Sequence, residues 1–212
     1  PLQIARKRLP WAGLTTLFPH IRPATKQDIQ ILRKLWHVGM MVALVYVYSN
    51  VVTSQTGALT VLAVVGGPLV IFDFLRLKWK GLNRLLIWLF GPVMRKRELA
   101  SVSTMSYFLI GLCFIVAAFP KPIVIAAVLC LAFGDAAAGL VGIKFGKDML
   151  VRGKSLQGSV TCFMICSLII FLVLAFYGVS SEFLLFISVV GGLTATLAEL
   201  LTTKPLDDNL TI

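Results

Sequence analysis

Asp135 is the residue whose type and position point most strongly to chemistry. It stands in the run GDAAAGLVGIKFGK, from Gly134 to Lys147, which begins inside an apolar segment. A carboxylate in a membrane-spanning segment costs about 2.5–3.5 kcal/mol on insertion scales, and such residues usually have a function. The glycines and lysines that follow can approach and neutralise phosphate groups. The combination predicts a metal-bound nucleotide handled at a membrane surface.

The glycines of this run have two interpretations. On a helix, Asp135 shares one face with Gly139, Gly142 and Gly146. A face without side chains lets a ligand come close to the backbone, but a stripe of small residues is also how membrane helices pack. Helix packing would account for the glycines and not for the aspartate.

A second basic segment, GKSLQGS, follows from Gly153 to Ser159. It is not a Walker A loop, because Asp148 stands where that motif has its first glycine and no strand precedes it. Its backbone amides can still bind phosphate at the start of the next helix, although a solvated loop is the plainer interpretation. The candidate nucleotide-binding residues are Lys144, Lys147, Lys154, Ser155, Gly139, Gly142, Gly158 and Ser159.

Further carboxylates lie toward the end of the chain. Glu199 is near the end of an apolar segment, and Asp207 and Asp208 follow just beyond it. Magnesium favours carboxylates combined with substrate phosphates. We therefore expect Asp135, Asp207 and Asp208 to bind a metal. An exposed polar tail is the alternative for the last two, and a side chain reaching the interface is the alternative for Glu199.

Two N-terminal groups are weaker candidates. Arg33, Lys34 and His37 lie within one helical turn, where all three could face a phosphate, although a histidine at a membrane interface is often a polar anchor. Asp73 and Arg76 are three residues apart, a spacing typical of an ion pair within one helix.

The composition shows which elements must position these residues. Hydrophobic residues make up 58% of the 212 residues and charged residues only 14%, which indicates an all-α integral membrane protein. The sequence predicts about six transmembrane helices and, over 82–93, a shorter interfacial helix. The expected spans are 35–53, 58–75, 105–119, 122–142, 158–177 and 183–203.

The basic residues predict the orientation. Nineteen of the 20 lysines and arginines fall before, between or after these spans on one side, and Lys121 alone falls on the other. The positive-inside rule then places both ends of the chain in the cytoplasm. Topology and anionic lipids explain the net charge of +11, so no nucleic-acid partner is expected. We divide the chain into a basic arm, 1–32, and a membrane-embedded domain, 33–212.

These blocks together resemble the CTP-dependent lipid kinases, a family that includes dolichol kinases, phytol kinases and yeast-type diacylglycerol kinases. The central blocks are also similar to those of CDP-diacylglycerol synthases, which bind magnesium through aspartates. Those synthases typically carry a Ser-Pro-Lys-Lys-Thr-type run where this chain has GKSLQGS, and that difference favours a kinase. The blocks that carry the resemblance are 33–37, 73–76, 97–99, 134–147, 153–159, Glu199 and 207–212.

The resemblance implies a lipid kinase domain in which a lipid hydroxyl attacks the γ-phosphate of CTP. Asp135, Asp207 and Asp208 would hold Mg²⁺, with Glu199 as a further ligand or as the base. Lys144, Lys147, Lys154 and Ser155 would bind the triphosphate, and His37 or Asp73 would orient the hydroxyl.

The partners and setting follow from the same resemblance. The acceptor is expected to be diacylglycerol, a polyprenol such as dolichol, or phytol, at an active site on the cytoplasmic face. We also expect a homodimer as one possible assembly and a further span after Ile212. A cytidylyltransferase acting on phosphatidate is the alternative enzyme, and a transporter or scaffold is the alternative without catalysis.

Overall fold

The computed structural model describes residues 26–52, 54–79, 81–83, 101–179 and 182–201. Within these ranges the regular structure is helical, and the one strand-like pairing described is an isolated antiparallel bridge between Met149 and Ser155. The predicted all-helical class is confirmed.

Two long helical runs in the chain each contain a π-helical turn. Such turns interrupt α-helices mostly as short bulges, often at functional sites, and the second one ends directly before Asp135. The first run consists of α3 (Gln55–Val61), η2 (Leu62–Gly66) and α4 (Gly67–Lys78). The second consists of α7 (Lys121–Leu129), η4 (Cys130–Gly134) and α8 (Asp135–Phe145).

The remaining helices are uninterrupted. The longest is α2, with 25 residues, and a short 3₁₀ turn, η5, precedes α9. Their bounds are α2 Lys26–Asn50, α6 Thr104–Ala118, η5 Val151–Gly153, α9 Leu156–Phe176 and α10 Leu184–Leu201.

Four helical runs are long and apolar enough to cross a membrane, and the chain is an integral membrane protein. They are Gln55–Lys78, Lys121–Phe145, Leu156–Phe176 and Leu184–Leu201, and Thr104–Ala118 is a shorter apolar helix. The expected total of about six spans is therefore not confirmed. Most of the expected interfacial helix over 82–93 lies outside the described residues.

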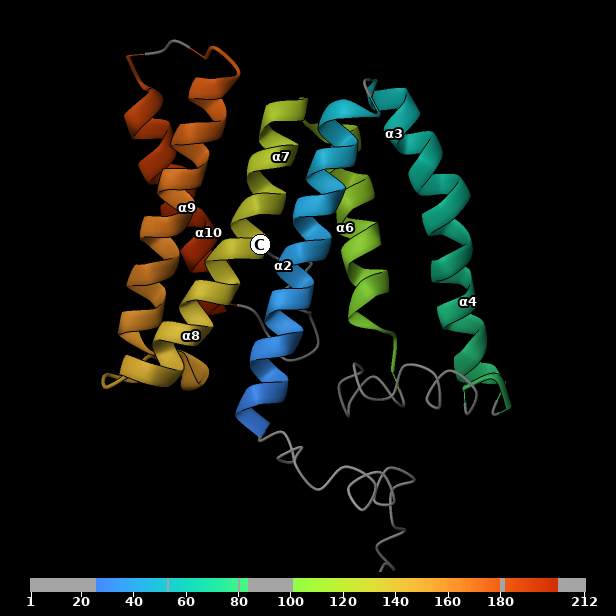
Figure 1. Cartoon of the computed structure of the whole chain (residues 1–212), viewed down its shortest axis with the longest axis horizontal. Helices are drawn as coiled ribbons and strands as arrows, with labels where there is room; N and C mark the ends of the chain where they lie inside the picture. Colours follow the sequence, from blue (N-terminus) through green and yellow to red (C-terminus); the bar gives the residue numbers. More distant parts are fainter. Residues whose placement is uncertain (1–25, 53, 80, 84–100, 180–181, 202–212) are drawn as a thin grey trace, which may run out of the picture.

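The helices form two groups joined by α2, as Figure 1 shows. In one group α9 packs against α10, α8 and α7. In the other, α6 packs against α3, η2 and α4. Helix α2 lies between them and contacts α7, η4 and α8.

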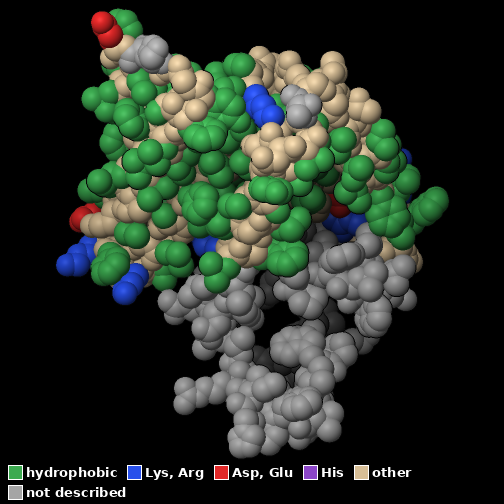
Figure 2. Space-filling model, turned by 45° about the horizontal axis from the view of Figure 1, so that its top comes forward, with side chains coloured by type: hydrophobic (Ala, Val, Ile, Leu, Met, Phe, Trp, Pro, Cys, Tyr) green, Lys and Arg blue, Asp and Glu red, His purple; other side chains and the backbone are tan. Residues whose placement is uncertain are grey.

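Most of the described basic side chains lie toward one end of the bundle, and Lys121 at the start of α7 lies at the other. The start of α9 and the ends of α4, α8 and α10 lie at one end, the lower end in Figure 1. Figure 2 shows apolar side chains over much of the visible face, with most of the visible lysine and arginine side chains toward its lower part. We call this the charged end; its described basic side chains are Lys34, Arg76, Lys78, Lys144, Lys147 and Lys154.

Small residues let the helices of the α8–α9–α10 group approach closely. A Cβ added at Gly158 of α9 would lie 2.8 Å from the carbonyl oxygen of Ala138 in α8. Three of the four cysteines, Cys130, Cys162 and Cys166, are free and buried in this interface. The interface therefore positions the start of α9 against the middle of α8.

Candidate functional site

Asp135 lies at the first position of α8 and pairs with Lys34 from α2. The Lys34 ammonium is 3.6 Å from Asp135 Oδ2 and donates a hydrogen bond of 2.9 Å to the backbone carbonyl of Asp135. The side chains are 18% and 30% exposed respectively. Because neither is sealed inside the protein, the pair can exchange partners with an incoming ligand.

Gly139 makes this pair possible. A Cβ at this position would lie 2.0 Å from Lys34 Nζ, so a side chain there would displace the lysine. The lysine crosses the groove that the missing side chain leaves, one turn after Asp135. On the helix face that carries Asp135 and the glycines, the Lys34 ammonium from α2 therefore lies against Gly139. Gly142 faces Ser155 instead, with its added Cβ 3.1 Å from Ser155 Oγ, which is a helix-packing contact.

Glu199 forms a second carboxylate–lysine pair at the same end. Lys154 Nζ donates a 2.6 Å hydrogen bond to Glu199 Oε1, and the glutamate side chain is only 3% exposed. Glu199 lies in the last turn of α10, where the partial negative charge of the helix terminus disfavours an acid. The position therefore weakens the helix rather than stabilising it.

The other oxygen of Glu199 is buried and has no hydrogen-bond partner within the described part of the chain. An unsatisfied buried polar atom costs about 1–3 kcal/mol, and more for a charged group. A carboxylate oxygen left open beside a lysine is suited to accept a proton or a cation. Glu199 is thus the described carboxylate with most capacity to bind something that the protein itself does not supply.

The start of α9 brings the two pairs into one region. Ser155 caps this helix by accepting a hydrogen bond from the Gly158 amide at 3.2 Å. Gly158 lies against Ala138, the neighbour of Gly139, and Lys154 directly precedes the cap. The contacts therefore run from Lys34 through α8 and the cap of α9 to Lys154 and Glu199.

The loop before α9 is folded back by its own hydrogen bonds. Gln157 donates to the Asp148 carboxylate at 2.8 Å and accepts from the Lys147 amide at 3.1 Å. Gly153 has φ +79°, a conformation that favours glycine. Ser155 and Ser159 are buried and bonded within the start of α9, since Ser159 Oγ donates to the Ser155 carbonyl at 3.2 Å.

The remaining predicted lysines line the outside of this region. Lys144, in the last turn of α8, and Lys147, just beyond it, are exposed. Lys144 Nζ lies 5.2 Å from the ring centre of Phe145. Long flexible cations at this position suit a soluble anion that approaches from outside the bundle.

Asp73 lies in a different cluster. One of its oxygens accepts from Arg76 Nε, and the other accepts from Ser106 Oγ at 2.7 Å and from the Ser103 amide at 2.8 Å. Arg76 also donates to the Ser101 carbonyl at 2.8 Å. Asp73 therefore ties α4 to the start of α6. Its expected role with an attacking hydroxyl stays a prediction.

The sequence predicts Lys34 only as a possible phosphate contact beside Arg33 and His37, and it does not predict the pairing with Asp135. No spacing rule joins Lys34 to a residue 101 positions later. His37 is half-buried one turn further along α2. Asp207 and Asp208, the other expected metal ligands, lie outside the described residues.

The expected magnesium ion stays a prediction, and the described residues can be compared with its ligand preferences. Among the described residues, no three histidine, cysteine, aspartate or glutamate side chains lie close enough together to hold a metal ion. Asp135 and Glu199 supply hard oxygen atoms, and one oxygen of Glu199 has no hydrogen-bond partner among the residues that the structure describes. Magnesium commonly binds through one or two carboxylates together with substrate phosphates, which matches this donor set.

Comparison with known proteins gives a consistent set of relatives. The chain is 28% identical to CTP-dependent diacylglycerol kinase 1 of Saccharomyces cerevisiae, over 89% of this chain and 70% of the yeast protein. It is 33% identical to the protein of the same name from Schizosaccharomyces pombe, over 43% of each chain. The protein of that name from Eremothecium gossypii is 29% identical, over 68% of this chain and 51% of its own length.

Two of these three matches cover about half or less of the relative's length. No family model matches the chain, and no solved structure does. The names of the relatives agree with the resemblance drawn from the sequence blocks and do not favour a cytidylyltransferase. The chain is therefore a homologue of proteins named CTP-dependent diacylglycerol kinase, and these relatives support the resemblance to the CTP-dependent lipid kinase family.

Proposed function

We propose that this protein transfers the γ-phosphate of CTP to the hydroxyl of diacylglycerol, at the cytoplasmic face of a membrane. One observation carries the proposal: two lysine–carboxylate pairs, Lys34–Asp135 and Lys154–Glu199, lie in an apolar bundle, the second near its charged end and the first further inside. Phosphoryl transfer depends mainly on positioning and charge neutralisation, and these pairs offer both. The relatives' names supply CTP and diacylglycerol as the substrates.

The nucleotide would bind from the water side of the charged end. Lys144, Lys147 and Lys154 would contact the phosphates, with the start of α9 beneath them. Mg²⁺ would be held by Asp135, with Asp207 and Asp208 as the expected further ligands, and would neutralise charge on the phosphates. Lys34, which is partly exposed, would contact a phosphate oxygen of the bound nucleotide.

The acceptor would reach the same region from the bilayer. Its hydroxyl oxygen forms a bond to the γ-phosphorus, the bond from that phosphorus to the β–γ bridging oxygen breaks, and CDP leaves. The hydroxyl proton passes to a base, and the open oxygen of Glu199 is the described group best suited to accept it. The products are phosphatidate and CDP.

The test is incubation of the purified protein with γ-labelled CTP and a set of lipids: diacylglycerol, a polyprenol, phytol and phosphatidate. We expect label in phosphatidate formed from diacylglycerol, together with CDP. If only the polyprenol or only phytol becomes labelled, that lipid and not diacylglycerol is the acceptor. Phosphatidate converted to a CDP-lipid with release of pyrophosphate would contradict the kinase.

A further inference from the structure

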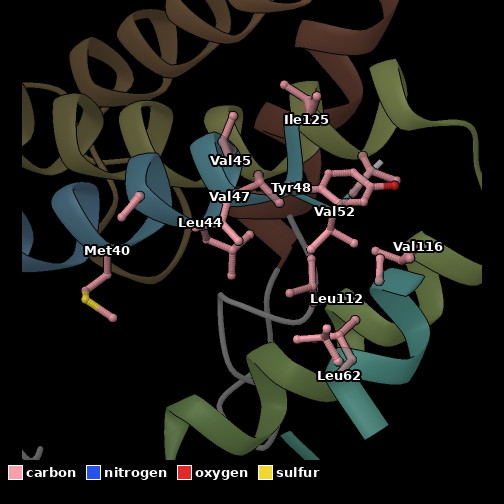
Figure 3. A pocket seen from close by; sticks show the side chains of 15 residues that line it. Met40, Leu44, Val45, Val47, Tyr48, Val52, Leu62, Leu112, Val116 and Ile125 are labelled. Atoms are coloured by element: carbon pink, nitrogen blue, oxygen red, sulfur yellow. The ribbon is translucent and has the colours of Figure 1, made fainter. Parts of the chain in front are cut away.

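An apolar cavity of about 290 Å³ lies between α2, the α3–η2 run, α6 and α7. Figure 3 shows Leu44, Tyr48, Leu62, Leu112 and Val116 around it. All of its 15 lining residues are apolar or aromatic, and Tyr48 alone carries a side-chain oxygen. A site of this chemistry suits hydrocarbon and offers nothing to the head group of a lipid.

The cavity opens toward the bilayer. Met40, Val47 and Val61 line it and are also 48%, 44% and 47% exposed on the outside of the bundle. The run that forms one wall, Gln55–Lys78, is long and apolar enough to span a membrane. The surroundings of the opening are therefore lipid chains, and an occupant can enter sideways.

Helix α2 connects this cavity to the candidate site. Lys34, Val45 and Tyr48 share one face of α2. With a rise of 1.5 Å per residue, the cavity begins at Met40, about 9 Å beyond Lys34, and reaches Tyr48, about 21 Å beyond it. Lys121, at the start of α7, lies 5.2 Å from the ring centre of Tyr48. The cavity therefore lies between Lys34 and the end of the bundle opposite the charged end, where the end of a long extended acyl chain would lie if its head group were at Lys34.

The size of the cavity limits what it can hold. At about 30 Å³ for each water-sized group, a cavity of about 290 Å³ has room for about ten methylene groups. That is enough for the distal part of one acyl chain.

We propose that this cavity binds the distal part of one acyl chain of the lipid acceptor, so that chain length contributes to substrate choice. The inference rests on the proposed function, because it takes the lipid head to be at the Lys34–Asp135 and Lys154–Glu199 pairs. It adds a specificity site distant from the reacting atoms. A hexanoyl chain is too short to reach the cavity, whereas an oleoyl chain reaches it.

The kinetic test fills the cavity from two sides. Ala58→Phe in α3 and Ala43→Phe in α2 change lining residues, and Ala63→Phe is the matched control in the same run, since Ala63 is exposed and does not line the cavity. We expect kcat/KM for dioleoylglycerol to fall about tenfold in the first two variants, the scale of an apolar subsite lost. Values for dihexanoylglycerol, and KM for CTP, should stay unchanged. An equal fall for both lipids, or the same fall in Ala63→Phe, would overturn the proposal.

A binding test separates this inference from the proposed function. A diacylglycerol with a diazirine at the end of one oleoyl-length chain should label peptides of α2 and α6, and excess dioleoylglycerol should compete. Labelling of these helices without phosphorylation of any lipid alcohol would refute the kinase and leave the cavity assignment intact. Phosphorylation with labelling elsewhere, or competition by phosphatidylcholine equal to that by dioleoylglycerol, would refute the cavity assignment.

Discussion

Asp73 and Glu199 are both buried carboxylates beside a basic residue near the charged end, but the protein satisfies them differently. Both oxygens of Asp73 are bonded, and its partner Arg76 is 2% exposed and reaches on to Ser101. Glu199 has one bonded oxygen and one open oxygen, and its partner Lys154 is 32% exposed. A saturated pair stabilises a fold, whereas an incomplete pair with a partly exposed cation can bind a substrate.

The Lys34–Asp135 pair resembles the Glu199 pair in this respect. It is partly exposed, its carboxylate contact of 3.6 Å is long, and it crosses from α2 to α8. We therefore expect substitutions in the Asp73 cluster to lower the stability of the fold, and substitutions in the other two pairs to lower activity.

The largest expected effect is on stability, at the saturated cluster. Arg76→Ala leaves the Asp73 carboxylate buried without its charge partner, which typically costs 3–5 kcal/mol, on the order of half the stability of a domain. We expect early loss of the monodisperse species on heating in detergent. Lys78→Ala, an exposed residue in the same helical turn, is the control and should behave like the wild type. A fully stable Arg76→Ala protein would show that this cluster is not structural.

The next largest effect is on catalysis, at Asp135. Asp135→Asn keeps the size and the hydrogen bond but removes the charge that a metal needs, and we expect kcat to fall about 10²- to 10³-fold. Thermal stability should be close to that of the wild type. Asp148→Asn, a loop acid bonded to Gln157, is the matched control. Activity retained at saturating magnesium would make Asp135 structural and remove the contrast with Asp73.

Glu199→Gln tests the open oxygen. The variant keeps the shape of the side chain and removes its ability to accept a proton, so we expect kcat to fall about 10²-fold with little change in KM for CTP. Thr194→Val, at an exposed position on the same helix, is the control for changes in α10. A rise in KM for CTP with kcat preserved would assign Glu199 to positioning Lys154 instead.

Lys154→Ala should act mainly on nucleotide binding. A lysine interacts with phosphate largely as a point charge, so we expect KM for CTP to rise about tenfold and KM for diacylglycerol to stay constant. The two constants can be measured with each substrate varied in turn. If the constant for the lipid rises and that for CTP does not, the loop before α9 has been misassigned.

Gly139→Ala should give the smallest effect. The added Cβ would collide with the flexible end of Lys34, which can move away without disturbing the backbone. We expect a several-fold loss of activity with the fold intact. Gly39→Ala in α2 is the control, because nothing lies within 4 Å of its added Cβ. Equal activity in the two variants would mean that Lys34 need not lie against α8.

Sequence periodicity and charge determined the helical class of this protein and several of its candidate site residues. The apolar composition requires helices, because backbone groups in lipid must be satisfied within the segment. The cost of a carboxylate in an apolar segment singled out Asp135 and Glu199. The ion pair between Asp73 and Arg76 followed from their spacing alone, since neighbours three apart meet on any helix.

Only the tertiary structure decided how the helices stand next to each other, and with that the partners of the two incomplete pairs. Lys34 meets Asp135 across 101 positions, and Lys154 meets Glu199 across 45. Neither pairing is visible in one dimension, because a lipid-facing surface and a helix-facing surface are equally apolar. Whether a glycine accommodates a side chain or a neighbouring backbone is likewise decided by the tertiary structure. Gly139 lies against the side chain of Lys34, and Gly158 lies against the backbone carbonyl of Ala138. The cavity along α2 also depends on packing, because the sequence does not show that α2, the α3–η2 run, α6 and α7 surround a common space.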